Sequence, residues 1–187
     1  MRIIGGNNAG LRINPTKLKL RPTTDRSKEA LFNILYNKVD YDNVSVLDLF
    51  SGTGNISYEF ASRGAKSIYA IEKNNKSVEF IKDFNKKNNF DINVIRKDVF
   101  SFIKQTKMSF DVIFADPPYD INEVKYYELI SLIYNRKLIN DGGLFIIEHA
   151  SKITLDKHIF FSNTRKYGDS SFSFYINLNN WLSLFSL

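Results

Sequence analysis

Short apolar runs alternate with amphipathic stretches along most of this chain, and this alternation restricts the fold more than any other feature. The runs that predict strands are 44–50, 67–71, 92–96, 110–115 and 144–148. The stretches with helical spacing are 55–63, 76–87, the segment around 102–103, and 126–134, together with an earlier helix that Thr24 or Asp25 can cap and whose apolar face is Ala30, Leu31, Ile34 and Leu35. Strands that alternate with helices need crossover connections, so we expect an α/β fold with a mostly parallel sheet covered by helices on both faces.

The two ends of the chain predict smaller additions to this sheet. Residues 2–4 and 11–13 can form two short strands around a glycine-containing turn, which predicts an N-terminal β-hairpin. Near the other end, 163–167 and 172–177 predict a closing pair of strands. The final residues, 178–187, contain Trp181 and no charge, so we expect this tail to pack on the core or on a partner.

Length and composition are consistent with one domain over residues 1–187. A chain of 187 residues with 43% hydrophobic residues can form one well-packed core and is too short for two of ordinary size. We expect a basic hairpin or arm at 1–23, a core at 24–177 and an apolar tail at 178–187. The absence of cysteine excludes disulfides, thiolate metal sites and a cysteine nucleophile. Without a bilayer-spanning run or an apolar leader, we expect a cytoplasmic protein.

The tetrapeptide Asp116-Pro117-Pro118-Tyr119 follows the apolar run 110–115 directly. Two prolines fix φ and remove two amide donors, so the carbonyls near them can face outward beside Asp116 and Tyr119. A planar amine suits such a site, because it can donate hydrogens to the Asp116 carboxylate and to a Pro117 carbonyl while its ring stacks on Tyr119. The alternative is a rigid turn that only ends a strand, and the tetrapeptide alone does not decide between them.

A glycine-rich loop follows the first predicted strand, in the run Asp48-Leu49-Phe50-Ser51-Gly52-Thr53-Gly54. In open α/β sheets, ligands bind outside the carboxyl ends of the strands, where such a loop lies. A dinucleotide-binding loop has a third glycine three residues later, but Ser57 stands there. Asp48 before the turn suits an amino group or a sulfonium cation better than a pyrophosphate. A glycine loop that binds nothing is the common alternative.

Acidic residues lie at the ends of four successive predicted strands: Asp48, Glu72, Asp98 and Asp116. Glu72 lies at the distance from Gly52 where nucleoside-binding folds place an acid on the ribose hydroxyls. Each acid alone is more often a helix cap or a surface charge. Their joint placement predicts a ring of acids around one pocket.

Basic residues are concentrated at the N-terminus. Residues 1–28 contain seven Lys and Arg and the single acid Asp25, so 7 − 1 = +6, which is the whole net charge of the chain. A basic segment attracts a phosphate backbone, and this points to Arg2, Arg12, Lys17 and Lys19 as nucleic-acid contacts. The alternative is a solvated hairpin whose charge only maintains solubility, since the segment has no aromatic residue to stack a base.

Together these residues carry a resemblance to a known family. The glycine loop, Glu72 and Asp116-Pro117-Pro118-Tyr119 resemble the ordered motifs of S-adenosylmethionine-dependent amino-group methyltransferases. Further runs resemble the bacterial small-subunit ribosomal RNA guanine-N2 methyltransferase family called RsmD. These runs are Arg2-Ile3-Ile4-Gly5-Gly6, Leu20-Arg21-Pro22-Thr23, Glu29-Ala30-Leu31-Phe32-Asn33, Ser62-Arg63-Gly64-Ala65 and Arg165-Lys166-Tyr167-Gly168. The resemblance covers residues 1–177, and the 178–187 tail departs from the family pattern.

The resemblance implies a class I methyltransferase fold, which is Rossmann-like with a seven-stranded sheet, and a role for each matching residue. S-adenosylmethionine would be bound by the residues of the loop and the next two strand ends: Asp48, Phe50, Gly52, Thr53, Gly54, Glu72, Lys73, Asp98 and Val99. Asp116, Pro117, Pro118 and Tyr119 would receive a guanine amino group. Arg21, Thr23 and Arg26 would line an RNA entrance. The implied substrate is 16S ribosomal RNA, free or within an assembling small subunit, and the enzyme would be a monomer.

Three other functions remain open at this stage. The tetrapeptide also fits methylation of adenine N6 or of a glutamine amide. A nicotinamide-dependent oxidoreductase uses a similar sheet, although Ser57 and Asp48 count against it. A nucleic-acid-binding module with an inactive pocket is the third. The two histidines, His149 and His158, have no partner at ligand spacing, so no metal site is expected.

Overall fold

The computed structural model describes residues 1–15, 25–118 and 121–177. The chain divides into two compact units, Met1–Val99 and the part that begins at Phe100. The candidate cap Thr24 and the predicted basic residues within 16–24, together with Tyr119 and the 178–187 tail, lie outside the described residues.

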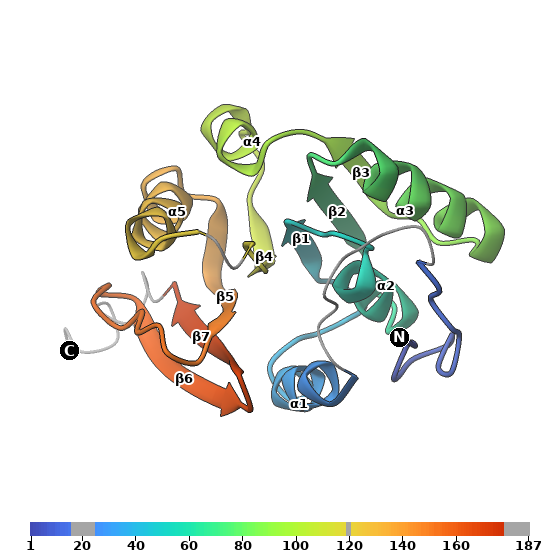
Figure 1. Cartoon of the computed structure of the whole chain (residues 1–187), viewed down its shortest axis with the longest axis horizontal. Helices are drawn as coiled ribbons and strands as arrows, with labels where there is room; N and C mark the ends of the chain where they lie inside the picture. The colour runs from blue at the N-terminus through green and yellow to red at the C-terminus, as the bar shows by residue number, and fades with distance from the viewer. Residues whose placement is uncertain (16–24, 119–120, 178–187) are drawn as a thin grey trace. The chain divides into compact units, whose positions relative to one another are not determined.

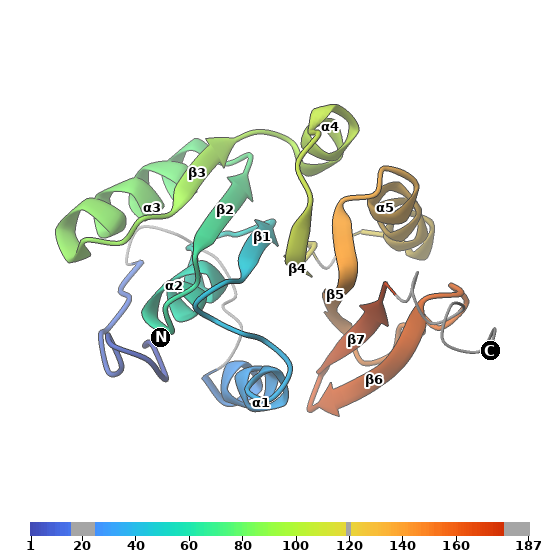
Figure 2. The ribbon, with the colours of Figure 1, turned by 180° about the vertical axis from the view of Figure 1, so that it is seen from behind.

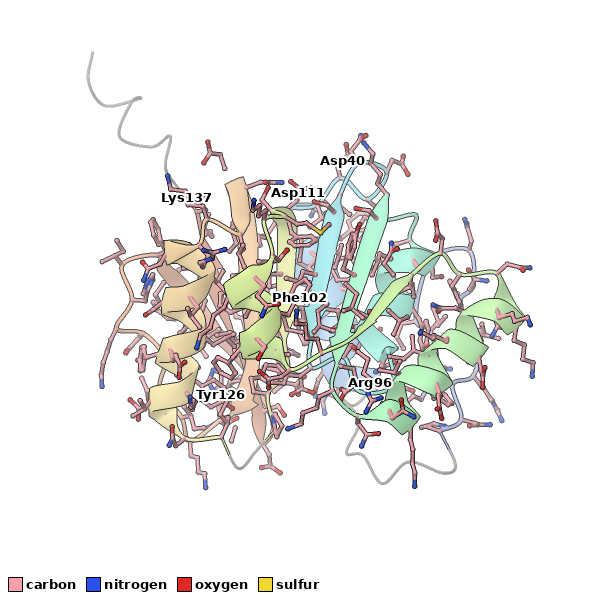
Figure 3. The ribbon with its side chains drawn as sticks, turned by 90° about the horizontal axis from the view of Figure 1, so that it is seen from above. Asp40, Arg96, Phe102, Asp111, Tyr126 and Lys137 are labelled. Atoms are coloured by element: carbon pink, nitrogen blue, oxygen red, sulfur yellow. The ribbon has the colours of Figure 1, made fainter. Side chains whose placement is uncertain are left out.

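The first unit contains three parallel strands and three helices. Its strands are β1 (Ser45–Leu49), β2 (Ser67–Glu72) and β3 (Asn93–Arg96), in the order β3-β2-β1. Helices α2 (Asn55–Ser62) and α3 (Asn75–Asn88) connect successive strands, and α1 (Asp25–Leu35) precedes them (Figure 1). The predicted alternation of strand and helix is confirmed here. Figure 3 shows Asp40, before β1, and Arg96, at the end of β3, at opposite ends of this unit.

Helix α2 is buried along almost its whole circumference, which is unusual for a helix that contains a glutamate. Its residues 55–60 and Ser62 are all buried, including Glu59. Phe60 meets Phe32 of α1 in an edge-to-face contact with ring centroids 4.9 Å apart. The helix ends at Ser62, and Gly64 follows the cap residue Arg63 with a φ of 95° that favours glycine, while the Ala65 amide donates to the Phe60 carbonyl. A helix packed on so many sides needs internal partners for any charge that it carries.

The N-terminal segment does not form the predicted β-hairpin. An isolated antiparallel bridge joins Arg2 to Arg12, and the amides of Ile3 and Ile13 donate to the Leu11 and Met1 carbonyls, but no strand forms. The amides of Ile4 and Gly5 donate to the two carboxylate oxygens of Glu59, each at 2.8 Å. The segment therefore lies on α2 (Figure 2), and these two backbone donors are used there rather than in a strand ladder.

The second unit contains a mixed sheet. Its elements in chain order, after α4 (Val99–Gln105), are β4 (Phe110–Ala115), α5 (Glu123–Asn135), β5 (Ile139–Ala150), β6 (Phe161–Tyr167) and β7 (Ser170–Ile176). The strand order is β4-β5-β7-β6, with β4 and β5 parallel and the remaining pairs antiparallel. Figure 3 labels Phe102 on α4 and Tyr126 on α5. The predicted closing pair is confirmed as β6 and β7.

Strand β5 begins earlier than expected. It was predicted to start at Leu144, after an Asp-Gly-Gly turn, but it starts at Ile139 and contains an irregularity. The register against β4 shifts between Phe110, opposite Ile139, and Val112, opposite Leu144. Asn140 donates to the Asp111 carboxylate at 2.7 Å across this irregularity. The glycines thus form a bulge inside the strand rather than a turn before it.

The seven strands of the two units form a mixed, mostly parallel arrangement, with helices between the parallel strands. No helix among the described residues is long and apolar enough to cross a membrane. Within the same residues, no three His, Asp or Glu side chains gather as a metal site would require. His149, placed by the sequence just beyond a strand, is buried within β5 and lies 2.8 Å from the Ser173 hydroxyl through Nε2.

Candidate cofactor loop and candidate amine-binding turn

The glycine loop of the first unit turns sharply between β1 and α2. Phe50, Gly52 and Gly54 all have positive φ, at 59°, 53° and 79°. At Gly54 both the angle and the space require glycine, because an added Cβ would lie 2.9 Å from Cζ of the buried Tyr58 ring. The Ser51 amide donates to the Ile71 carbonyl at 3.1 Å, which joins the loop to the end of β2. The loop conformation is therefore held by packing and hydrogen bonds from its own unit.

Glu72, the last residue of β2, faces this loop. Its Oε2 accepts from the Gly52 amide at 2.9 Å and its Oε1 from the Asn74 amide at 2.7 Å. The side chain is only part-buried, so it remains accessible from solvent. The structure thus brings Glu72 to Gly52. Whether Glu72 also holds a ribose stays a prediction.

Asp48, in β1, is only 1% exposed and binds the start of α2. Its Oδ2 accepts from the Ser57 amide at 3.1 Å and from the Ser57 hydroxyl at 2.5 Å. Gly54 at the N-cap has no side chain to cap the helix, so Asp48 supplies that acceptor from the neighbouring strand. Sequence reasoning treated Ser57 only as a missing glycine and did not foresee this role.

The environment of Asp48 disfavours its charged form. Burial, with a smaller contribution from the nearby Glu72 charge, raises the pKa of this carboxyl from 3.8 to about 7, and the two Ser57 hydrogen bonds oppose the shift. Because the pKa of this carboxyl lies close to neutral pH, a cation that binds beside the glycine loop would stabilise its ionised form. This is the electrostatic property that a sulfonium or ammonium ligand would use.

The other residues predicted for cofactor binding differ in exposure. Thr53 and Val99 are buried, Phe50 is half-buried, and Lys73 and Asp98 are exposed. Asp98 lies two residues beyond β3 and immediately before α4. The described hydrogen bonds and charge interactions therefore bring together Asp48, Gly52 and Glu72, while cofactor contacts of the others stay predictions.

The predicted amine-binding turn begins where β4 ends. The strand is buried at every position except Asp111, so the chain emerges from the core at Asp116. Asp116 is half-buried, Pro117 is buried and Pro118 is exposed. The Pro118 carbonyl accepts from the Ile121 amide at 3.0 Å. That carbonyl therefore already has one amide donor, and amine contacts of the Asp116 carboxylate and of the proline carbonyls stay predictions.

The predicted nucleic-acid residues that the structure describes are exposed. They are Arg2, Arg12 and Arg26. Arg2 lies 3.8 Å from the Asp25 carboxylate, in a solvent-exposed pair. Lys17, Lys19, Arg21 and Thr23 lie outside the described residues. Nucleic-acid contacts of all seven stay predictions.

Lys28 corrects the charge argument. The sequence counts it with the basic N-terminal arm, but its side chain is completely buried and lies 3.2 Å from Glu59. Burial lowers the pKa of Lys28, and the charge and hydrogen bond of Glu59 act in the opposite direction. A lysine inside an otherwise apolar helix face, with a glutamate inside another, was the available signal for this buried pair.

Comparison with known proteins agrees with this architecture. A family model described as conserved hypothetical protein 95 matches residues 1–176. The ribosomal RNA small subunit methyltransferase D of Buchnera aphidicola subsp. Baizongia pistaciae is 31% identical over 187 residues, which cover 97% of this chain and 94% of the relative. A hypothetical protein of Thermus thermophilus has a similar structure, with a TM-score of 0.81, 26% identity, and coverage of 94% of this chain and 98% of that one.

A more distant structure has the same fold. It is the T. thermophilus 16S rRNA N2 G1207 methyltransferase, in complex with AdoMet and guanosine, with a TM-score of 0.68 and 20% identity. The likeness covers 85% of this chain and 45% of that one. The family model and the full-length relative together decide the family. The chain belongs to the RsmD-like methyltransferase family.

Proposed function

We propose that this protein transfers a methyl group from S-adenosylmethionine to the exocyclic N2 amino group of a guanine in small-subunit ribosomal RNA. The observation that carries the proposal is the Asp116-Pro117-Pro118-Tyr119 run, which follows β4 directly in the sequence, in a chain of the RsmD-like family. The names of the relatives support a ribosomal RNA substrate. The whole chain would act as one catalytic domain.

The first unit offers a fit for the cofactor. Asp48 is a buried carboxyl with a pKa raised to about 7, and a cation near it would favour its ionised form. Glu72 holds the Gly52 amide and keeps its carboxylate part-exposed, as a ribose contact requires. Lys73, Asp98 and Val99 would contact the adenosine end. When bound, S-adenosylmethionine would supply an electrophilic methyl group on a sulfonium. The amine would attack this methyl carbon, and the sulfur would leave as a neutral thioether.

The second unit would hold the amine. The lone pair of guanine N2 is delocalised into the ring, so the amine is a weak nucleophile until its hydrogens are held in a fixed direction. Asp116 would accept one hydrogen and the Pro117 carbonyl the other, with Tyr119 against the ring. Positioning and electrostatics then lower the barrier. The methylated amine is cationic and acidic, and it would lose its proton to Asp116 or to water.

A nucleobase that is modified at an exocyclic group usually has to leave its stack. The exposed Arg2, Arg12 and Arg26 would contact the phosphate backbone, together with Lys17, Lys19, Arg21 and Thr23. Binding through phosphates weakens steeply as salt rises. We therefore expect RNA affinity to depend strongly on ionic strength, while cofactor affinity changes little.

The test is transfer of labelled methyl from S-adenosylmethionine to naked small-subunit RNA and to small-subunit particles, followed by identification of the modified nucleoside. We expect N2-methylguanosine. Asp116→Ala should bind the cofactor with normal affinity and lose turnover by about a hundredfold or more. The exposed Asp156 offers a matched control, and Asp156→Ala should retain activity. Label in N6-methyladenosine, in DNA or in a glutamine side chain would overturn the guanine assignment.

A further inference from the structure

Lys28 occupies the centre of a buried polar cluster in the first unit. Its side chain and that of Glu59 are both 0% exposed. The Lys28 ammonium lies 2.6 Å from the Arg2 carbonyl, 2.8 Å from Asn55 Oδ1 and 3.2 Å from Glu59 Oε2. An ammonium has three hydrogens and no acceptor, so three acceptors use its full capacity.

The three acceptors come from two segments of the chain, the N-terminal segment and helix α2. Arg2 is in the N-terminal segment, Glu59 is in the middle of α2, and Asn55 is the first residue of α2, directly after Gly54 of the glycine loop. Because an ammonium only donates, the Asn55 atom that it contacts must be the carbonyl oxygen. The orientation of this amide is therefore fixed by Lys28. Asn55 Nδ2 is buried, without a hydrogen-bond partner in the described residues.

The N-terminal segment is bound to α2 by further contacts near its other end. The amides of Ile4 and Gly5 donate to Glu59, and the Asn7 amide donates to the Ser62 carbonyl at 2.7 Å. The Ser62 hydroxyl donates to the Gly5 carbonyl at 2.6 Å. Displacing this segment would remove the Arg2 acceptor from Lys28 and two amide donors from Glu59, and Lys28 would have to find a new arrangement.

We propose that Lys28 is a positioning residue that couples the docking of the N-terminal segment to the conformation of the glycine loop. The loop would respond to the segment through one ammonium group that holds both Arg2 and Asn55. By reciprocity, a ligand that orders the loop would also strengthen docking of the segment. The nature of the two ligands, a sulfonium cofactor and RNA, rests on the proposed function, but the coupling itself does not.

The first experiment needs no ligand. Gly6→Ala should loosen the segment, because an added Cβ would lie 1.9 Å from the Ser62 carbonyl oxygen and φ is 78°. We expect about a threefold or greater increase in hydrogen exchange of the Gly54 and Ser57 amides in this variant. In a Lys28→Met background the loop should already exchange faster, and Gly6→Ala should add nothing. Lys28→Arg should restore part of the response.

Arg63→Met is the matched control, because Arg63 also pairs with Glu59, at 2.9 Å, and lies beyond the far end of α2 from Asn55. This variant should lose stability but keep the response of the loop to Gly6→Ala. If Gly6→Ala leaves loop exchange unchanged in the native background, or changes it equally with and without Lys28, the coupling is refuted. If Lys28 contributes only to stability, Gly6→Ala should change loop exchange equally with and without Lys28.

The second experiment adds S-adenosylmethionine and measures exchange of the Ile3 and Ile13 amides, which bond to the Leu11 and Met1 carbonyls. We expect slower exchange in the native protein and no change in Lys28→Met. If the native protein does not bind the cofactor, the proposed function fails and the ligand-free test still decides the coupling. Binding without any effect on these amides would refute the coupling alone.

Discussion

Two buried carboxyl groups of the first unit, Glu59 and Asp48, differ in the number and charge of the groups that donate hydrogen bonds to them. Glu59 in the middle of α2 has four donors, from Lys28, Arg63 and the amides of Ile4 and Gly5. Asp48, in β1, has the two donors of Ser57, both on one oxygen, and no ion pair joins it to a cation in the described parts of the chain. Burial raises the pKa of Asp48 to about 7.

The difference separates a structural carboxylate from a candidate binding group. A buried charge that has cationic and amide partners stabilises the arrangement around it, and removing either partner is costly. A buried carboxyl that has no cationic partner changes its ionisation when a charged ligand binds beside it. Helix α2 thus carries at its middle a carboxylate with two cationic partners, Glu59. Near its start, beside the glycine loop, it meets a carboxyl that has only the two Ser57 donors, Asp48.

The largest effect is expected from Glu59→Ala. This change leaves the buried Lys28 ammonium without its anionic partner and the amides of Ile4 and Gly5 without their acceptor, and it should lower the free energy of unfolding by about 3–5 kcal/mol. The matched control is Glu128→Ala, which removes an exposed pair with Lys125 and should cost less than about 1 kcal/mol. Urea unfolding measures both. Equal losses in the two variants would remove the distinction between Glu59 and a surface charge.

Asp48→Asn should have a large effect that depends on pH. The pKa of this carboxyl in the folded protein, about 7, exceeds its ordinary value of 3.8, so its contribution to stability is full below pH 3.8 and is lost as pH rises through 7. Asparagine does not titrate, so the native protein should lose stability relative to Asp48→Asn between these pH values. The upper limit of this relative loss is on the order of 4 kcal/mol. Urea unfolding at pH 5 and pH 8 measures the change, and a constant difference between the two proteins would contradict the raised pKa.

Gly6→Ala tests how tightly the segment that completes the Glu59 cluster is held. The variant combines a φ of 78° with a Cβ only 1.9 Å from the Ser62 carbonyl. Gly10 has a φ of 87° and open space around it, so Gly10→Ala isolates the backbone term of about 1–2 kcal/mol. Thermal unfolding should show a larger loss for Gly6→Ala than for Gly10→Ala. Similar losses in the two variants would mean that the segment can move away from the Ser62 carbonyl without a measurable loss of free energy.

The smallest effect is expected from Ser57→Ala. It removes one of the two donors on Asp48, which should cost about 1 kcal/mol at pH 8 and raise the pKa of Asp48 further. Titration of the Asp48 carboxyl by NMR in labelled protein measures the shift. A lower pKa in the variant would show that the Ser57 hydroxyl does not stabilise the anion.

The sequence predicted most of the fold because local periodicity determines where strands and helices form. The parallel strands and their helices follow from patterns within short windows. The Glu59 cluster depends on contacts such as that of Ile4 with Glu59, 55 positions apart, and a local pattern can indicate that Lys28 and Glu59 are buried but not which residues they meet. The predicted N-terminal hairpin was wrong for this reason, and Lys28 was counted as a surface charge.

The site was predicted unevenly for a related physical reason. Residue types at strand ends indicate which side chains can meet a ligand, and Asp48, Glu72 and Asp116 were predicted in this way. Hydrogen bonds that depend on exact distances were not, such as those from Ser57 to Asp48 and from Ile121 to the Pro118 carbonyl. Turn chemistry shows where a carbonyl can face outward but not which amide reaches it.

We expect Asp48 to lie at the cofactor site and to ionise when the cofactor binds. The most direct test is calorimetric titration of S-adenosylmethionine at pH 6, in two buffers with different heats of ionisation. The native protein should bind and release close to one proton, because the cationic ligand ionises Asp48. Asp48→Asn should bind at least about tenfold more weakly, without that proton release, and NADH should give no heat with either protein. Equal affinity and equal proton release in the two proteins, or binding of NADH alone, would contradict the account.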